Sequence, residues 1–199
     1  MTKQEVKNIF KNMEECVKIA RDAVEAYVKE GRVIMLPDGL PLELLQKKAG
    51  TFVTIEKEGM LRGCIGTFLP IQENIAKEII QNAISAATED YRFGPITKEE
   101  LPLLSYTVYV LEKPQLVKDI KELDPKKYGV IIRTCPIVLP NVHDVVFDGR
   151  PVAKTGLLLP DLPEVNAVEE QISIACQKAG IDPIEEKIII YKFTAEKHT

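Results

Sequence analysis

The sequence predicts an α+β fold with a mainly antiparallel sheet flanked by helices. Three segments show helical spacing of apolar residues, and runs of β-branched and aromatic residues lie between them. At least two pairs of these runs are joined by short turn sequences, as in β-hairpins, whereas a doubly wound parallel sheet needs long crossover connections. A length of 199 residues suits one domain, or one domain with a smaller lobe attached, so we expect a single domain over residues 1–199.

The first expected element is a long amphipathic helix over about residues 3–29. Its apolar residues recur at intervals of three and four, which places them on one face. Cys16 lies on this stripe and is predicted to be a small core residue. Thr2 and Glu5 have the spacing of a capping box, and Gly31 marks the expected end of the helix.

A β-hairpin and a second helix are expected next. Strands over residues 51–56 and 60–68 flank Glu58-Gly59, a pair of residues typical of turns. The second helix is expected over about residues 72–89, where apolar residues again recur at helical spacing. It ends before a Gly-Pro sequence, because neither residue continues a helix well.

The other elements are expected from shorter patterns. They are an ordered crossover over residues 32–50, a capped turn from Thr97 to Glu100, a strand over 105–111, a helix beginning at Asp124, a strand over 130–133, a hairpin over 145–153, a strand or tight turn over 154–160, a helix over 164–178 and a final strand over 187–193. Helices and strands therefore interleave while neighbouring strands form hairpins, which is typical of α+β proteins.

Composition and charge argue against several classes of protein. The formal net charge is −4, and the Lys doublets extend into no basic block, which disfavours nucleic acid as a partner. No apolar run approaches the roughly 20 residues that a membrane helix requires, so no membrane association is expected. The chain starts without a signal sequence and its four widely spaced cysteines form no CxxC pair, so we expect a cytoplasmic protein with free thiols.

Familiar motifs of cofactor-dependent enzymes are missing from the sequence. It contains no Walker loop, Gly-x-Gly-x-x-Gly, Gly-x-Ser-x-Gly or His-Glu-x-x-His, which removes the usual support for nucleotide-binding and hydrolase classes. Cys135 and His143 lack the paired spacing of a zinc site, and His198 lies in a C-terminal tail that we expect to be frayed. No metal site is predicted, and the cofactor, if there is one, is unknown.

The most informative stretch is Leu61-Arg62-Gly63-Cys64-Ile65-Gly66. Strand alternation predicts that Arg62, Cys64 and Gly66 share one face, with the other three residues turned to the core. A guanidinium within roughly 7 Å favours a thiolate, so Arg62 is predicted to activate Cys64 as a nucleophile. Gly63 and Gly66 remove side chains around the sulfur, which lets a ligand or a backbone come close. The alternative is a buried, inert cysteine with the glycines serving a β-bulge.

Further polar residues follow the second helix. Asp90 and Arg92 lie beside the Gly-Pro loop, where they could join Cys64 in a cluster of nucleophile, orienting acid and anion holder. Alternatively, Asp90 and Arg92 form a structural ion pair at the end of the helix. Glu100 could likewise serve only as a capping carboxylate and not as a site residue. His143 could assist Cys64 only if the fold brings the two together; otherwise it is a loop histidine.

The run from Leu61 to Thr67 resembles the defining motif of the AMMECR family. The resemblance covers essentially the whole chain, through Phe52-Val53-Thr54, Asn82-Ala83, Ala86-Ala87, Asp90, Arg92-Phe93, Pro95, Thr97, Glu100-Leu101-Pro102, Gly156-Leu157-Leu158-Leu159-Pro160 and the helix ending in Cys176-Gln177-Lys178-Ala179-Gly180. The family's usual Arg-Phe-Pro-Pro stands here as Arg92-Phe93-Gly94-Pro95, which loosens a loop expected to border the site.

The resemblance implies a larger and a smaller lobe with a cleft between them that is lined by the motif. The candidate catalytic residues are then Cys64, Arg62, Asp90 and Arg92, and the candidate binding residues are Gly63, Gly66, Thr67, Phe93 and Glu100. The resemblance also implies a pathway shared with MEMO-like proteins and radical S-adenosylmethionine enzymes, because microbial relatives occur beside such proteins or fused to them. It implies no particular reaction.

Two functions of different classes follow from these residues. The first is a thiol-dependent enzyme or small-ligand-handling protein that uses a cleft around Cys64. The second is a non-enzymatic binding or adaptor module that holds a protein partner in the same cleft. An RNA-associated role is a third reading, which the negative net charge disfavours.

Overall fold

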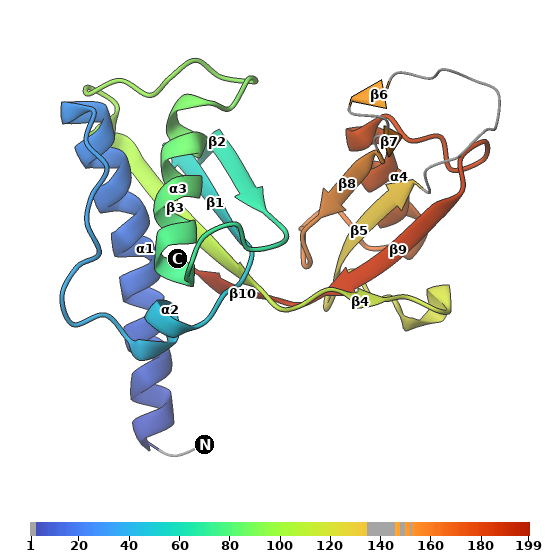
Figure 1. The fold of residues 1–199 in the computed structure, drawn as a ribbon, viewed down its shortest axis with the longest axis horizontal. Coiled ribbons are helices and arrows are strands. Elements are labelled where there is room, and N and C mark those ends of the chain that lie inside the picture. Colours follow the sequence, from blue (N-terminus) through green and yellow to red (C-terminus); the bar gives the residue numbers. More distant parts are fainter. Residues whose placement is uncertain (1–2, 135–145, 148–149, 152) are drawn as a thin grey trace. The chain divides into compact units, whose positions relative to one another are not determined.

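A computed structural model of the chain describes residues 3–134, 146–147, 150–151 and 153–199, with side chains described over 14–134 and 153–199 (Figure 1). The chain divides into two compact units, Met1–Glu112 with Glu196–Thr199, and Lys113–Ala195. Each unit contains a four-stranded sheet and its own apolar core. The expected α+β class with antiparallel sheet and flanking helices is confirmed, whereas the expected cleft between lobes stays a prediction.

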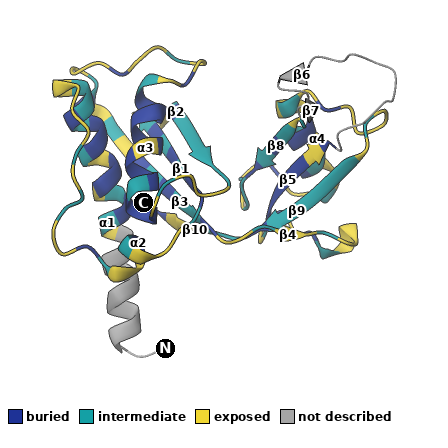
Figure 2. Ribbon diagram, viewed as in Figure 1, coloured by how far each residue is buried: buried dark blue, intermediate teal, exposed yellow. Residues whose placement is uncertain are grey.

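The first unit is a sheet covered by helices. Its strands are β1 (Thr51–Lys57), β2 (Met60–Thr67), β3 (Leu104–Leu111) and β10 (Ala195–His198), in the spatial order β10-β3-β1-β2. Its helices are α1 (Lys3–Glu30), α2 (Leu42–Gln46), α3 (Ile75–Thr88) and the 3₁₀ turn η1 (Leu101–Leu103). α1 packs on α3 and β3, and α3 packs on β1 and β2, so the inner face of α3 and the middle of the sheet are buried (Figure 2).

Local sequence explains where these elements begin and end. Gly31 ends α1 with a φ of +65°, as expected for a left-handed C-terminal glycine, and Cys16 is fully buried in the core as predicted. Glu58 and Gly59 both have positive φ, which gives the tight turn of the predicted hairpin. α3 begins later than expected because the side chain of Asn74 accepts a hydrogen bond from the N–H of Lys77 and so caps the helix.

The second unit repeats the pattern of a helix on an antiparallel sheet. Its strands are β4 (Gln115–Leu116), β5 (Gly129–Thr134), β8 (Thr155–Leu158) and β9 (Ile188–Phe193), in the order β4-β9-β5-β8. The other elements are η2 (Ile120–Glu122), α4 (Val168–Ala179) and the strand pair β6 (Val146–Phe147) and β7 (Arg150–Pro151). α4 packs on β8 and β5, and Gly180 ends it with a φ of +61°.

In both units a glycine lets a helix lie directly on a strand. A Cβ on Gly63 in β2 would collide with the carbonyl oxygen of Ala86 in α3. A Cβ on Gly156 in β8 would collide in the same way with the carbonyl oxygen of Ala175 in α4. These two strand glycines are therefore required by helix packing.

Three expectations about single elements are wrong. No helix begins at Asp124, whose side chain instead accepts from the N–H of Lys126 in a turn. α4 begins at Val168 and not near 164. The C-terminal tail is not frayed, because it forms β10 beside β3 and buries His198 to 1% exposure. Thr2 lies outside the described residues, as do residues 148–149 in the middle of the hairpin predicted over 145–153.

Among the described helices, none combines the length and the apolar character needed to cross a membrane.

We expect the substitution Gly63→Ala to lower the free energy of unfolding by about 2 kcal/mol or more, because the added methyl group must push α3 away from β2. Urea denaturation followed by circular dichroism measures this loss. Gly94→Ala is the matched control, since open space surrounds Gly94, and it should change stability by less than about 0.5 kcal/mol. Equal stability of the two variants would contradict the close packing of α3 on β2.

Candidate functional site

The candidate site is built around Cys64 on β2, the outer strand of the first sheet. Cys64 lies opposite Thr54 of β1, and the Thr54 hydroxyl is 3.4 Å from the Cys64 sulfur. Cys64 is half-buried, whereas Cys16 and Cys176 are buried. Of the three cysteines whose side chains the structure describes, Cys64 is therefore the one that a ligand can reach.

Asp90 and Arg92 hold the main chain of Cys64 from the other side. The Asp90 carboxylate accepts a hydrogen bond of 2.9 Å from the N–H of Cys64, and an Arg92 N–H donates to the carbonyl of Cys64 at 3.4 Å. An outer strand normally leaves such N–H and C=O groups unpaired. The Asp90–Arg92 pair thus takes the place of a neighbouring strand at the position of the cysteine.

The Asp90–Arg92 ion pair is itself tightly bound. Arg92 donates through Nε to Oδ1 at 3.0 Å and through Nη2 to Oδ2 at 2.7 Å. The Asp90 side chain is 4% exposed and that of Arg92 is 42% exposed. The pKa of Asp90 is lowered to about 2, first by the hydrogen bond from Arg92 and further by the N–H of Cys64.

The guanidinium of Arg92 is the cation next to the cysteine. The pKa of Arg92 is raised, first by the hydrogen bond to Asp90, and the charge of Asp90 adds to the effect. Arg92 also lies over the ring of Phe93, with 5.5 Å from the guanidinium carbon to the ring centroid. Phe93 thereby contributes to the orientation of Arg92.

The strand alternation predicted for Arg62 is interrupted by a β-bulge. The register of β1 and β2 shifts between Ile55 and Glu56: Ile55 pairs with Gly63 and Glu56 with Leu61, so Arg62 is the extra residue of a β-bulge. The bulge breaks the alternation, and Leu61, expected in the core, is 43% exposed. The hydrogen bonds described for Arg62 go to Glu100, Gly94 and Pro95, and none goes to Cys64. Activation of the Cys64 thiol by Arg62 therefore stays a prediction that these contacts do not support.

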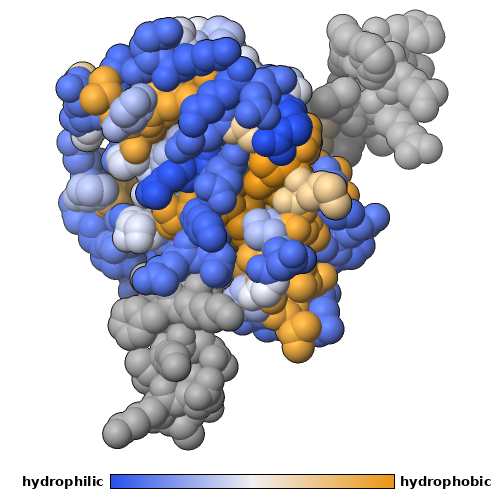
Figure 3. All heavy atoms as spheres, turned by 90° about the vertical axis from the view of Figure 1, so that its left-hand side faces the viewer, coloured by the Kyte–Doolittle hydropathy of each residue, from blue (hydrophilic) through white to orange (hydrophobic). Residues whose placement is uncertain are grey.

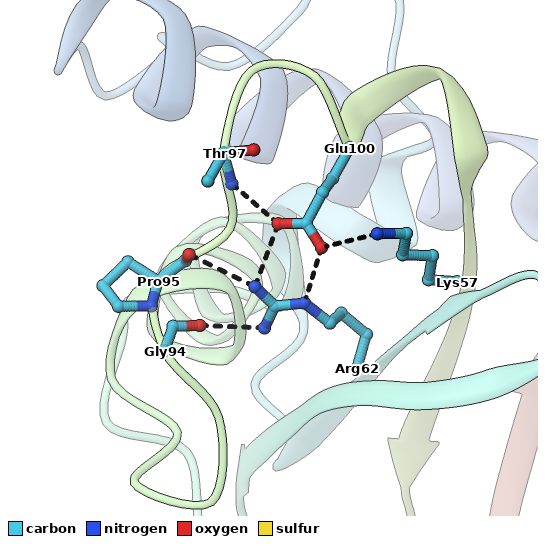
Figure 4. Close-up of polar contacts among 6 residues, drawn as sticks. All are labelled: Lys57, Arg62, Gly94, Pro95, Thr97 and Glu100. Carbon is cyan, nitrogen blue, oxygen red and sulfur yellow. Dashed lines mark hydrogen bonds and ion pairs between the residues drawn. The ribbon is translucent and has the colours of Figure 1, made fainter.

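Arg62 instead anchors the loop that follows α3 (Figure 4). It donates to both carboxylate oxygens of Glu100, at 2.9 and 3.0 Å, and to the carbonyls of Gly94 and Pro95 at 2.8 and 3.2 Å. Glu100 also accepts from the N–H of Thr97, as the predicted capping residue, and from Lys57. The pKa of Glu100 is lowered to about 2, chiefly by the hydrogen bond from Arg62.

The remaining candidate residues of the motif are engaged in packing. Gly63 accommodates α3, and a Cβ on Gly66 would collide with the ring of Phe52 on the paired strand. The Thr67 hydroxyl donates to the buried carboxylate of Glu78 at 2.5 Å and accepts from Asn82 at 3.2 Å. The space at both glycines is therefore filled by neighbouring main-chain and side-chain atoms.

Sequence reasoning missed one residue that touches the candidate thiol, Thr54. Counting outward from the Glu58-Gly59 turn pairs Thr54 with Gly63, and only the bulge moves Thr54 opposite Cys64. Cys135 and His143 lie outside the described residues, so the predicted approach of His143 to Cys64 is untested. The described residues contain no cluster of three or more His, Cys, Asp and Glu that could hold a metal ion.

The fold and site define an α+β protein with a cysteine fixed on an outer strand. The family model AMMECR1 matches residues 17–198, and the chain belongs to this family. A protein of Thermotoga maritima is 46% identical over 183 residues, which cover 92% of this chain and 95% of that protein. A protein of Clostridium acetobutylicum is 44% identical over 183 residues, but the match covers only 35% of its length and 92% of this chain.

A solved structure shares the fold. The crystal structure of an uncharacterized protein from Pyrococcus horikoshii superposes with a TM-score of 0.78 at 32% sequence identity, covering 94% of this chain and 90% of that chain. The α+β architecture with two antiparallel sheets is therefore shared with an experimental structure.

The Arg62–Glu100 pair predicts a defined loss of stability in acid. The pKa of Glu100 is about 2 in the folded protein against an ordinary value of 4.5, so its contribution is complete above pH 4.5 and is lost as the pH falls toward 2. Glu100→Gln should therefore cost about 2 kcal/mol at neutral pH and progressively less below pH 4.5.

Urea denaturation at several pH values between 7 and 3 measures the effect of Glu100→Gln. Glu73→Gln is the control, because Glu73 forms an exposed i,i+4 pair with Lys77, and its substitution should change the pH dependence of stability much less than Glu100→Gln does. A difference between Glu100→Gln and the parent protein that stays constant with pH would contradict the charged state assigned to Glu100.

Proposed function

We propose that the protein handles a small anionic ligand at Cys64, as a thiol-dependent enzyme or as a ligand-binding protein. The observation that carries this proposal is a half-buried thiol on a residue whose carbonyl accepts a hydrogen bond from the guanidinium of Arg92, which is 42% exposed. A cation next to a thiol favours the thiolate, the form that acts as a nucleophile. The same guanidinium can hold a carboxylate or phosphate of the ligand.

Each residue of the candidate site has a distinct role in this proposal. Cys64 contacts the ligand, and Arg92 holds its anionic group. Asp90 is a positioning residue, since it fixes both the Arg92 guanidinium and the N–H of Cys64. Thr54 adds a hydroxyl 3.4 Å from the sulfur. Arg62 and Glu100 contribute indirectly, because they anchor the loop that carries Arg92.

The proposed setting is the cytoplasm, where reducing conditions keep thiols free. We further propose that the protein acts in a pathway with MEMO-like and radical S-adenosylmethionine proteins, as the family resemblance implies. The length of the Clostridium acetobutylicum relative is compatible with this proposal, because most of that protein lies outside the matching region.

The alternative is an adaptor that holds a protein partner through the same surface. It is favoured by apolar side chains exposed near the site: Tyr91 is 95% exposed between Asp90 and Arg92, and Leu61 is 43% exposed on β2. Exposed aromatic residues are common anchors of protein interfaces. An adaptor of this kind tolerates Cys64→Ser, whereas a thiol-dependent activity does not.

The first experiment is the rate of alkylation of each cysteine in the native protein as a function of pH, read by mass spectrometry. We expect Cys64 to react first, and Arg92→Gln to slow its reaction near pH 7 by at least about threefold, because a neighbouring positive charge is lost. Arg62→Gln is the comparison variant for loop order. It removes the guanidinium that binds Glu100 and the carbonyls of Gly94 and Pro95 but keeps Arg92, so it should slow the reaction clearly less than Arg92→Gln does.

Two outcomes would decide against the thiol function. One is a Cys64 that reacts only after unfolding, which makes the cysteine structural and favours the adaptor. The other is an equal effect of Arg92→Gln and Arg62→Gln, which would mean that loop order, and not the charge of Arg92, governs access to the sulfur.

A further inference from the structure

The connection between α1 and α2 contains a segment with the form of a strand that has no neighbour. In residues 33–36, Val33 and Met35 are 57% and 89% exposed, whereas Ile34 and Leu36 pack against the core. Alternation of exposed and inward side chains is typical of a half-buried β-strand. The sequence Val33-Ile34-Met35-Leu36 also has the composition of a strand.

The main chain of this segment is unpaired. Within the part of the chain that the structure describes, residues 33–36 make no hydrogen bond through their N–H or C=O groups. Water satisfies such groups only as long as nothing covers them, and an unpaired extended edge is a template for a further strand.

A groove of about 450 Å³ lies beside the segment. Residues 33–36 form one wall, and Gln72, Lys77, Ile80 and Gln81 form the other. Ile71 is 75% exposed next to this second wall. The side of the molecule that carries α1 and this connection has apolar patches between hydrophilic residues (Figure 3).

The charges around the groove indicate what it accepts. Lys77 is neutralised by Glu73 at 2.5 Å, so the groove has no net charge and suits an uncharged, apolar side chain. The side-chain amides of Gln72 and Gln81 can bond to a peptide main chain. Asp38 is exposed just beyond the segment and suits a basic residue at one end of the occupant.

The size of the edge distinguishes a short peptide from a second copy of the chain. Four residues in extended form span only about 13 Å. A stable dimer needs about 800 Å² of buried surface on each partner, which a four-residue edge and one small groove do not supply. A single extended segment that fills the groove matches the available surface.

We propose that residues 33–36 are a docking edge for an extended, apolar peptide segment of a partner protein. The segment adds to the edge as a strand through main-chain hydrogen bonds, and alternate side chains enter the groove along α3. This surface lies at the N-terminal half of α3, while Asp90 and Cys64 lie beyond its C-terminal end, so the proposal does not depend on the thiol function.

The first test is amide hydrogen exchange of the free protein. The amides of Ile34, Met35 and Leu36 should exchange nearly as fast as those of an unfolded chain, because they have no partner. Strong protection of these three amides in the free protein would overturn the proposal, since the edge would already be paired.

The second test uses random octapeptides displayed on phage and selected against the whole protein. Selected peptides, resynthesised, should bind at least about tenfold more weakly to Met35→Lys, and alternate N-methylation of their amides should weaken binding as strongly. Ile184→Lys is the matched control: Ile184 is 90% exposed in the other unit, and the change should leave binding unaltered. Binding should also protect the amides of residues 34–36.

Three results would overturn the docking edge. A selection that yields no peptide sensitive to Met35→Lys means that the groove takes no peptide. If peptides still bind after N-methylation, apolar contacts alone hold them, and they do not add to the edge as a strand. Self-association that disappears in Met35→Lys means that a second copy occupies the edge. Because Met35 is 89% exposed, its substitution leaves the fold intact in each case.

Discussion

The close approach of α3 to β2 is the constraint on which the candidate site depends. Gly63 lies directly under the carbonyl of Ala86, where any side chain would collide. Asp90 follows Ala86 by about one helical turn, and Cys64 follows Gly63 directly. The contact between helix and strand therefore brings the Asp90 carboxylate to the N–H of Cys64 at 2.9 Å. The absence of a side chain at Gly63 therefore allows α3 to lie close to β2, and this close packing positions Asp90 next to the main chain of Cys64.

Two ion pairs keep the loop after α3 against β2, and they limit how arginine variants can be interpreted. The side chains of Asp90 and Glu100 are 4% and 14% exposed, so removal of either arginine leaves a poorly solvated carboxylate. Breaking such a pair commonly costs more than the pair contributed, because the remaining charge lacks compensation. The double variant Asp90→Asn with Arg92→Gln keeps two hydrogen-bonding amides without a charge, and so separates the charge next to Cys64 from the stability of the loop.

Sequence patterns that extend over many residues predict this fold correctly. They fail where a single residue sets the register of a strand. The spacing of apolar residues in α1 and the Glu58-Gly59 turn are local signals, and both elements match the structure. The grouping of Cys64, Asp90 and Arg92 was also predictable, although Asp90 and Arg92 bind the main chain of Cys64. The bulge at Arg62 was not predictable, because the alternation of β2 is compatible with a regular hairpin as well as with a bulged one. The choice depends on the packing of Gly63 against α3, which lies outside the hairpin. The burial of His198 depends on the distant strand β3, which no local pattern near the C-terminus indicates.

The two proposed surfaces share α3 but depend on different parts of it. The groove uses Lys77, Ile80 and Gln81 on the side of the helix that faces residues 33–36. The thiol site uses the last turn of the helix, where Ala86 meets β2, and the loop that follows. We expect a helix packed this closely to move as a rigid element. A ligand in the groove would then affect the thiol site only if it displaced α3 relative to Gly63. Because Met35 lies on the connection between α1 and α2 and not on α3, its side chain can be changed without disturbing that contact. The proposed peptide binding and the proposed thiol reactivity are therefore separable, and a variant that loses one without the other identifies the surface responsible.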